Sequence, residues 1–280
     1  MNVQNANGDV QDQISQIEYF IRKQVDVIVV VAGDCEALTD VMIKAREAGI
    51  KTVSYDRLIQ NAGCDLYISF DNTEVGRLMA RSLLENIPDG GDIFLIQGPL
   101  TDHNVTLVRE GIDETLAGSS LSVVYESNCA GWVAENAYTY TKEGLKQDRY
   151  VKGIICGNDD LASQAFRALS EERLAGKVYV TGQDGDLAAC QRIVEGTQEM
   201  TAFKSVEQEA SMAAKCAVLL GLGEEIEEAR STAYDGTYNV PYLELQPIAV
   251  TKETWTRLSL RAVSCKGGCV FECELGCTAG

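Results

Sequence analysis

Polar side chains with hydrogen-bonding groups follow most of the apolar runs in this sequence. The stretch IKTVSYDRLIQNAGCDLYISFDNTEVG places Asp56 and Arg57 directly after one run, and Asp71 and Asn72 directly after the next. Because acids accept hydrogen bonds and bases donate them, such a pair can hold a ligand that carries both donors and acceptors. Later runs end in the same way, with Asp102, His103, Asn104, Asn158, Asp159, Asp160, Gln183, Asp184, Asp186 and Lys204.

The strongest binding candidates in this group are balanced in charge. Two acids and two bases cancel, and two asparagines add neutral donors and acceptors: Asp56, Asp184, Arg57, Lys204, Asn104 and Asn158. A phosphate site would need net positive charge, and a metal site would need clustered ligands. A neutral polyol suits the set, because every sugar hydroxyl both donates and accepts. Trp132, one of two tryptophans, is the candidate ring for a sugar C–H face, with a place in the core as the alternative.

Each candidate also has a plain structural explanation. Asn72, Asp159 and Asp186 precede helical patterns and suit helix capping. The Asp56–Arg57 pair is equally consistent with a surface ion pair, and Lys204 with the first solvated residue after a strand.

Catalysis finds little support in the sequence. His103, the single histidine, has no serine or cysteine at a spacing that suggests a triad. Asp159, Asp184 and Asp186 resemble the carboxylates of a glycosidase, but nothing sets their separation. No phosphate-binding glycine fingerprint follows any predicted strand. We therefore expect a protein that is not an enzyme and that has no catalytic residue, no cofactor and no metal.

Strands and helices alternate along almost the whole chain. The run VDVIVVV is typical of a strand buried on both faces of a parallel sheet. Such repeated units predict an α/β fold with doubly wound parallel sheets, arranged as two lobes or as one closed barrel. In open sheets of this kind, ligands bind beyond the carboxyl ends of the strands. The predicted strands are 25–31, 66–70, 92–97, 121–126, 153–157, 178–182 and 200–203, with helices near 12–24, 36–49, 73–87, 104–117, 133–145, 159–173, 186–195 and 206–220.

Composition narrows the class of partner. The 280 residues carry a formal charge of −18, which would repel nucleic acid and anionic lipid. No apolar run is long enough to span a membrane. Met1 is followed by polar residues without a signal peptide, so either the protein is cytoplasmic or the start of the natural chain is absent. Only the tail of a strand precedes the first helix, and we expect that an opening strand–helix unit is missing.

The ten cysteines form two groups. Six are scattered singly, and we expect buried free thiols rather than disulfides: Cys35, Cys64, Cys129, Cys156, Cys190 and Cys216. The other four recur every fourth residue near the end, at Cys265, Cys269, Cys273 and Cys277. This spacing differs from the paired cysteines of common zinc sites, and the role of the 265–280 tail stays open.

Seven segments together resemble a known family. GIKTVSYDRLI, YISFDNTEVG, GWVAENA, GNDDLAS, TGQDGDLA, RIVEGTQEMTAFK and PIAVTKE occur in order between about residues 4 and 261. They are similar to the type I periplasmic sugar-binding family of bacterial ABC uptake systems, and within it to the members that bind D-xylose. His103 departs from the pattern, which has an asparagine there, and the opening strand–helix unit and the tail do not match.

The resemblance implies two α/β lobes that are joined by a three-segment hinge and close on one sugar. The first lobe would comprise 1–99 and 206–243, and the second 100–205 and 244–264. The implied ligand-binding residues, matched motif by motif, are Asp56, Arg57, Asn104, Trp132, Asn158, Asp184 and Lys204.

The resemblance also implies partners and a location. The ligand would be D-xylose or a related monosaccharide, and the closed form of a monomer would be read by an ABC transporter permease. The location would be periplasmic or extracellular, with membrane association through a partner or an N-terminal anchor. A sensor subunit for a membrane histidine kinase is one alternative. The effector domain of a sugar-responsive repressor is another, which would require a DNA-binding unit before residue 1.

Overall fold

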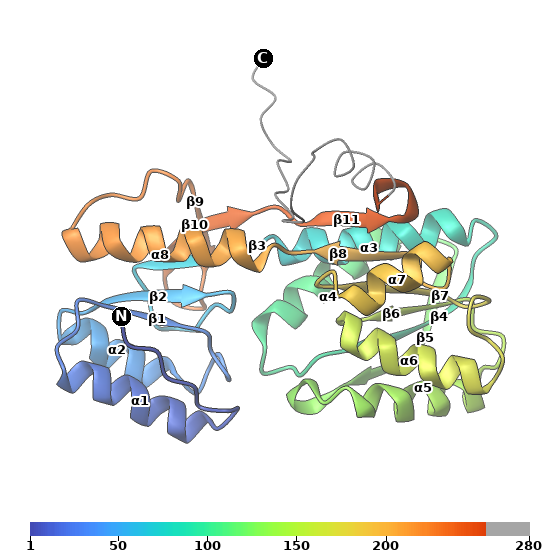
Figure 1. The fold of residues 1–280 in the computed structure, drawn as a ribbon, viewed down its shortest axis with the longest axis horizontal. Helices are drawn as coiled ribbons and strands as arrows, with labels where there is room; N and C mark the ends of the chain where they lie inside the picture. Colours follow the sequence, from blue (N-terminus) through green and yellow to red (C-terminus); the bar gives the residue numbers. More distant parts are fainter. Residues whose placement is uncertain (256–280) are drawn as a thin grey trace, which may run out of the picture.

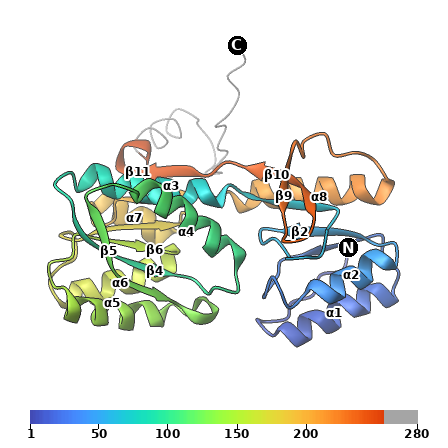
Figure 2. The same cartoon turned by 180° about the vertical axis from the view of Figure 1, so that it is seen from behind.

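The structure is a computed structural model that describes residues 1–255. Two lobes lie side by side, each with a β-sheet between layers of helices (Figure 1 and, from behind, Figure 2). This arrangement confirms the predicted α/β class and decides between its two options, because the strands form two separate sheets and not one closed barrel. Cys265, Cys269, Cys273 and Cys277, whose role the sequence left open, lie outside the described residues.

The first lobe contains a five-stranded sheet with the order β1-β2-β3-β10-β9. Its strands are parallel except for β9, which pairs antiparallel with β10. Helices α1 and α2 cover one face, and α8 covers the other, as Figure 1 shows on the left. The elements are α1 (Val10–Arg22), β1 (Val27–Val30), α2 (Thr39–Glu47), β2 (Lys51–Tyr55), β3 (Leu66–Phe70), α8 (Val206–Leu222), β9 (Ser231–Tyr234) and β10 (Asn239–Leu245).

The second lobe contains a six-stranded sheet with the order β11-β8-β7-β6-β4-β5. Helices α3 and α4 pack on one face, and α5 and α6 pack on the other. Only β11 runs antiparallel to its neighbour among the described strands of this sheet. The elements are α3 (Asn72–Asn86), β4 (Gly91–Gln97), α4 (His103–Leu116), β5 (Leu121–Asn128), the 3-10 turn η1 (Ala130–Trp132), α5 (Glu135–Gln147), β6 (Gly153–Cys156), α6 (Asp159–Glu171), β7 (Tyr179–Gln183), α7 (Leu187–Glu195), β8 (Met200–Phe203) and β11 (Ile248–Thr251).

The described chain crosses between the lobes three times, along one edge of the molecule. The crossings join β3 to α3, β8 to α8 and β10 to β11, and Figure 1 shows them together at the top. The crossings leave the carboxyl ends of β3, β8 and β10, so these strand ends lie at the junction of the lobes. The fold thereby places the residues that follow β2 and β8 next to the start of α4.

One predicted lobe boundary is wrong. The sequence placed 1–99 in the first lobe, but β4 hydrogen-bonds to β5 and β6 within the second sheet. The helix before it packs with α4 through the close approach of Gly76 and Gly111. The first crossing therefore falls at Asp71, because the chain leaves the first sheet at the end of β3. The other boundaries stay predictions.

Two of the three predicted helix caps are shifted by one residue. Asp71, and not Asn72, caps α3 by accepting a hydrogen bond from the Glu74 amide at 2.8 Å. Likewise Asn158 caps α6, accepting from the Leu161 amide at 2.8 Å. Asp186 stands at the N-cap position of α7 but makes no side-chain capping bond.

The six scattered cysteines are buried free thiols, as predicted. Burial raises the pKa of the Cys35 thiol to about 11. A thiol with so high a pKa is almost entirely protonated near neutral pH, and this keeps it unreactive.

Candidate ligand-binding site

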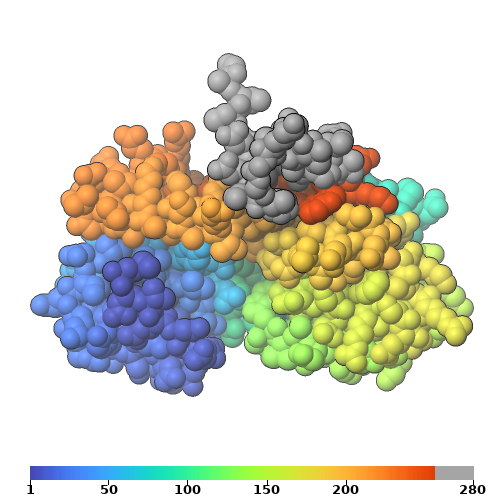
Figure 3. Space-filling view, viewed as in Figure 1, coloured from blue at the N-terminus to red at the C-terminus, as the bar shows by residue number. Residues whose placement is uncertain are grey.

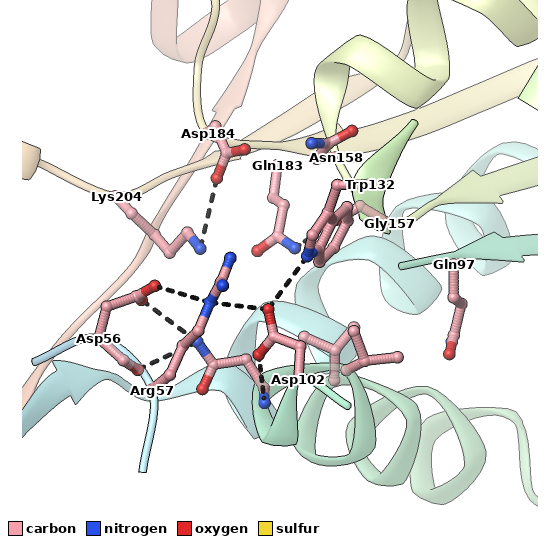
Figure 4. A pocket seen from close by; sticks show the side chains of 13 residues that line it. Asp56, Arg57, Gln97, Asp102, Trp132, Gly157, Asn158, Gln183, Asp184 and Lys204 are labelled. Atoms are coloured by element: carbon pink, nitrogen blue, oxygen red, sulfur yellow. Dashed lines mark hydrogen bonds and ion pairs between the residues drawn. The ribbon is translucent and has the colours of Figure 1, made fainter. Parts of the chain in front are cut away.

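A cavity of about 310 Å³ lies between the lobes. Figure 3 shows the furrow in which the two lobes meet, and Figure 4 shows the side chains inside. All seven residues named from the sequence line this one cavity, although they are far apart in the chain. The lining residues are Asp56, Arg57, Gln97, Asp102, Asn104, Val105, Val108, Trp132, Gly157, Asn158, Gln183, Asp184 and Lys204.

Three of the lining residues hold strained backbones. Asp56, Trp132 and Asp184 have φ values of 61°, 58° and 97°, in the left-handed region that side chains with a Cβ avoid. The amides of Asp56 and Asp184 still continue the strand ladders, donating to Ile68 O at 2.8 Å and Ala202 O at 2.9 Å. Such strain concentrates at functional sites, because it persists only where the surroundings enforce it.

Asp102 connects the two lobes and orients the aromatic ring. Its Oδ2 atom lies 2.8 Å from Arg57 Nε and accepts a hydrogen bond from Trp132 Nε1 at 3.1 Å, as Figure 4 shows. Its Oδ1 atom accepts a hydrogen bond from the backbone N–H of Asn104 at 3.0 Å and so caps α4. The sequence placed Asp102 at a strand end but left it out of the binding set. Only the folded chain brings it against Arg57.

Asn104 forms a second connection between the lobes. Its Nδ2 group donates to Asp56 O at 3.0 Å and to Asp56 Oδ1 at 3.2 Å. Asp56 and Arg57 expose only 26% and 24% of their side chains, so the alternative of a surface ion pair does not hold. Burial raises the pKa of Asp56, and the charges of Lys204 and Arg57 oppose this rise.

Lys204 lies in the crossing from β8 to α8 and points into the cavity. Its Nζ is 3.3 Å from Asp184 Oδ1, and only 15% of its side chain is exposed, so it is not a solvated residue at a strand end. Burial acts to lower the pKa of Lys204, but the carboxylates of Asp184 and Asp56 outweigh burial and raise it. The lysine is therefore held in its charged form.

The indole of Trp132 depends on a glycine. A Cβ atom on Gly98 would lie 2.2 Å from Trp132 Cζ2, far inside contact distance. The ring also packs partly against the core cluster beneath α5 and α6. Trp132 therefore packs partly on the core and also lines the cavity, so a core position does not exclude the predicted contact with a ligand, which stays a prediction.

Asn158 serves the fold and the cavity at once. Its Oδ1 atom accepts the capping bond of α6, whereas its Nδ2 group donates no hydrogen bond to a protein atom within residues 1–255. Asp159, the next residue, is fully buried and accepts bonds from Thr201 Oγ1 at 2.7 Å and the Gly185 amide at 3.0 Å. These bonds fix the loop that carries Asp184.

Three buried residues in the lining each have one side-chain amide atom without a partner. Gln97 Nε2, Asn104 Oδ1 and Gln183 Oε1 have no hydrogen-bond partner in the part of the chain that the structure describes. Their residues are only 3%, 7% and 5% exposed. An unpaired buried polar atom is costly, so a ligand with matching donors and acceptors would be favoured here. Gln97 and Gln183 follow the same strand-end pattern but were not selected from the sequence.

His103 lies outside this cavity. It lines a second hollow of about 410 Å³ together with Tyr242, Asp71 and Glu244. Burial lowers the pKa of His103. The histidine thus faces the hinge side, away from the candidate site.

Two further properties concern residues 1–255. They contain no group of three or more histidine, cysteine, aspartate or glutamate side chains arranged to hold a metal ion. They also contain no helix that is long and apolar enough to cross a membrane.

The sequence matches a known family and known relatives. The family described as periplasmic binding protein domain matches residues 1–225. The D-xylose-binding periplasmic protein of Haemophilus influenzae is 43% identical over 89% of this chain and 76% of its own length. The protein of the same name from Escherichia coli is 40% identical over 89% of this chain and 77% of its own length.

Solved structures share the fold. An ABC transporter solute-binding protein from Clostridium phytofermentans with bound β-D-glucose has a TM-score of 0.83 at 25% identity, covering 93% of this chain and 87% of its own. Another from Actinobacillus succinogenes with bound D-allose has a TM-score of 0.80 at 25% identity, covering 91% and 87%. With its two lobes, its three crossings and its cavity between the lobes, this chain belongs to the periplasmic binding protein family.

Proposed function

We propose that this protein captures a monosaccharide, D-xylose, between its two lobes and presents the closed form to an ABC transporter permease. The observation that carries the proposal is the cavity at the lobe junction, which both lobes and the β8–α8 crossing line with directed polar groups. Two relatives with at least 40% identity bear the name D-xylose-binding periplasmic protein. The seven ligand contacts would be Asp56, Arg57, Asn104, Trp132, Asn158, Asp184 and Lys204.

The chemistry of the lining favours a neutral polyol. Three carboxylates stand against two cations, so the cavity offers no excess of positive charge for a phosphate or carboxylate ligand. The carboxylates can accept hydrogen bonds from sugar hydroxyls, the cations can donate to them, and the unpaired amide atoms include both a donor and acceptors. The indole supplies the flat apolar face that sugar C–H groups pack against. A site built this way discriminates strongly, because an inverted hydroxyl leaves buried polar atoms unpaired.

Capture would work by lobe closure. The contacts Asn104–Asp56 and Arg57–Asp102 join the lobes and would break on opening. A sugar that contacts both lobes binds the closed form better and shifts an existing open–closed equilibrium towards it. The closed form is then the species that a permease recognises, at a periplasmic or extracellular location. A membrane sensor kinase could read the same closed form, and a pull-down with each partner distinguishes the two.

Isothermal titration calorimetry against xylose, ribose, arabinose, glucose and galactose tests the proposal, with analysis of the recovered sugar. We expect one-to-one binding that is tightest for xylose, with the sugar intact afterwards. Absence of binding to every sugar would overturn the proposal, and conversion of the sugar would make the protein an enzyme. X-ray scattering at saturating xylose should show compaction relative to the sugar-free protein.

A further inference from the structure

Glu209 is a buried acid that does not line the cavity. It stands in the first turn of α8, five residues after Lys204, and only 5% of it is exposed. Its Oε1 atom has no hydrogen-bond partner among residues 1–255. Glu207 on the same turn is exposed, so burial distinguishes Glu209 from its neighbour. A buried carboxyl with an unused oxygen at this place is costly to keep unless it serves the site.

Four titratable groups face Glu209 from the elements packed around it. They are Tyr55 at the end of β2, Asp56 in the following turn, Lys204 in the crossing and Tyr242 in β10. Burial and then the charge of Asp56 raise the pKa of Glu209, whereas Lys204 and contact with the backbone of Asp56 lower it; the balance brings it to about 8. The two residues that act most directly on Glu209, Asp56 and Lys204, both line the cavity.

We propose that Glu209 is a positioning residue for the cavity. While its carboxyl is protonated, Lys204 stays paired with Asp184; when the carboxyl ionises, it competes with Asp184 for Lys204. This inference rests on the proposed sugar-binding function. The protonated carboxyl adds no charge behind the site, so the 3.3 Å pair of Lys204 and Asp184 keeps its geometry. The ionised carboxylate offers the lysine a second acidic partner besides Asp184.

Sugar binding and the proton on Glu209 are then coupled. A sugar displaces water from Asp56 and Lys204, and charge interactions strengthen in the drier cavity. A second negative charge beside Asp56 becomes harder to accommodate, so the sugar-bound form favours the protonated acid. Because coupling between two ligands is reciprocal, the proton favours sugar binding to the same degree. Affinity therefore falls as pH rises through the range in which Glu209 ionises.

Calorimetry with D-xylose between about pH 6.5 and about pH 9.5 tests this role. Glu209→Gln removes the ionisation and keeps the shape, and Glu207→Gln is the matched control on the exposed side of the same turn. We expect the affinity of the unmodified protein to fall several-fold across this range, that of Glu207→Gln to fall equally, and that of Glu209→Gln to change much less. Parallel profiles for the unmodified protein and Glu209→Gln would overturn the role of Glu209.

Carboxyl ¹³C NMR of the unmodified protein provides a measurement that needs no variant. We expect the Glu209 signal to titrate in the sugar-free protein and to shift its midpoint to higher pH at saturating xylose. An unchanged midpoint would overturn the coupling. Absence of xylose binding at every pH would instead overturn the proposed function, and the sugar-free titration of Glu209 would still be readable.

Discussion

Arg57 of the first lobe and Asp102 of the second form an ion pair with Nε and Oδ2 2.8 Å apart. Asp102 is only 3% exposed and also accepts from the indole of Trp132 at 3.1 Å. The carboxylate of Asp102 thus contacts the other lobe and also orients the ring of Trp132. The contact joins parts of the chain that are 45 residues apart in sequence, and it exists only while the lobes are together.

Replacing Asp102 should weaken both closure and binding. Asp102→Ala leaves Arg57 without its nearest carboxylate and Trp132 without its acceptor, and loss of one partner of a buried pair costs about 3 kcal/mol. We expect a matching loss in xylose affinity by calorimetry and a more open mean shape by X-ray scattering. Unchanged affinity with normal compaction would show that the pair is incidental.

Gly98 should not tolerate even a methyl group. In Gly98→Ala the new Cβ would meet the indole at 2.2 Å, and overpacking of this kind costs about 1–3 kcal/mol. We expect a shift in the fluorescence emission of Trp132 and weaker xylose binding. Gly221→Ala is the control, because its Cβ would meet Val27 at 3.4 Å and Asp26 at 3.8 Å, which are ordinary contact distances. Equal effects of the two changes would contradict the steric explanation.

The ring and the N–H group of Trp132 can be separated by two substitutions. Trp132→Ala removes the apolar face and should weaken xylose binding by about 1–3 kcal/mol. Trp132→Phe keeps a flat face but loses the bond to Asp102 and should cost less. Titration calorimetry of both variants measures this difference, and unchanged affinity in Trp132→Ala would leave the residue with a core role alone.

Asp184 and Asp186 form a natural matched pair. Asp184→Asn removes the carboxylate nearest to Lys204, and we expect xylose affinity to fall by about 1–3 kcal/mol, the usual range for a hydrogen bond to a charged group. Asp186→Asn, two residues away and outside the cavity lining, should leave affinity unchanged. Equal losses would mean that the loop, and not the Lys204 partner, governs binding.

The folding stability of the sugar-free protein should depend on Glu209. Its pKa is about 8 in the folded state against 4.5 for the ordinary side chain, so the folded protein keeps a proton that the unfolded chain has lost between these values. The free energy of unfolding therefore decreases as pH rises from 4.5 to about 8, by on the order of 4 kcal/mol from this group.

Urea unfolding near pH 5 and near pH 8.5 measures this contribution as the difference between the unmodified protein and Glu209→Gln. Other titrating groups affect both proteins alike and cancel in the difference. Glu207→Gln should follow the unmodified protein at both pH values, because its side chain is exposed. A difference that stays constant with pH would contradict the raised pKa of Glu209.

The sequence predicted the elements well up to β8, because buried parallel strands and amphipathic helices leave strong periodic patterns. The strand 66–70 and the strand 200–203 were predicted with the bounds that the structure has. Strands β9, β10 and β11 were not predicted individually. Strand β9 is largely exposed and β10 alternates between buried and exposed residues, so neither has a continuous apolar run. The boundary at residue 99, which the family resemblance implied, was wrong because matching motifs do not say which sheet the strand between them joins.

The residue types by themselves determined that the site would be polar and balanced, lying where strands end, because those positions follow from chain chemistry and strand direction. The tertiary structure alone decided which strand ends meet. It brought Asp102 to Arg57, left Gln97 and Gln183 with unpaired amide atoms, placed His103 in a second hollow and buried Glu209. These relations depend on how two sheets pack across the crossings, and contacts between distant segments leave no local pattern in a single sequence.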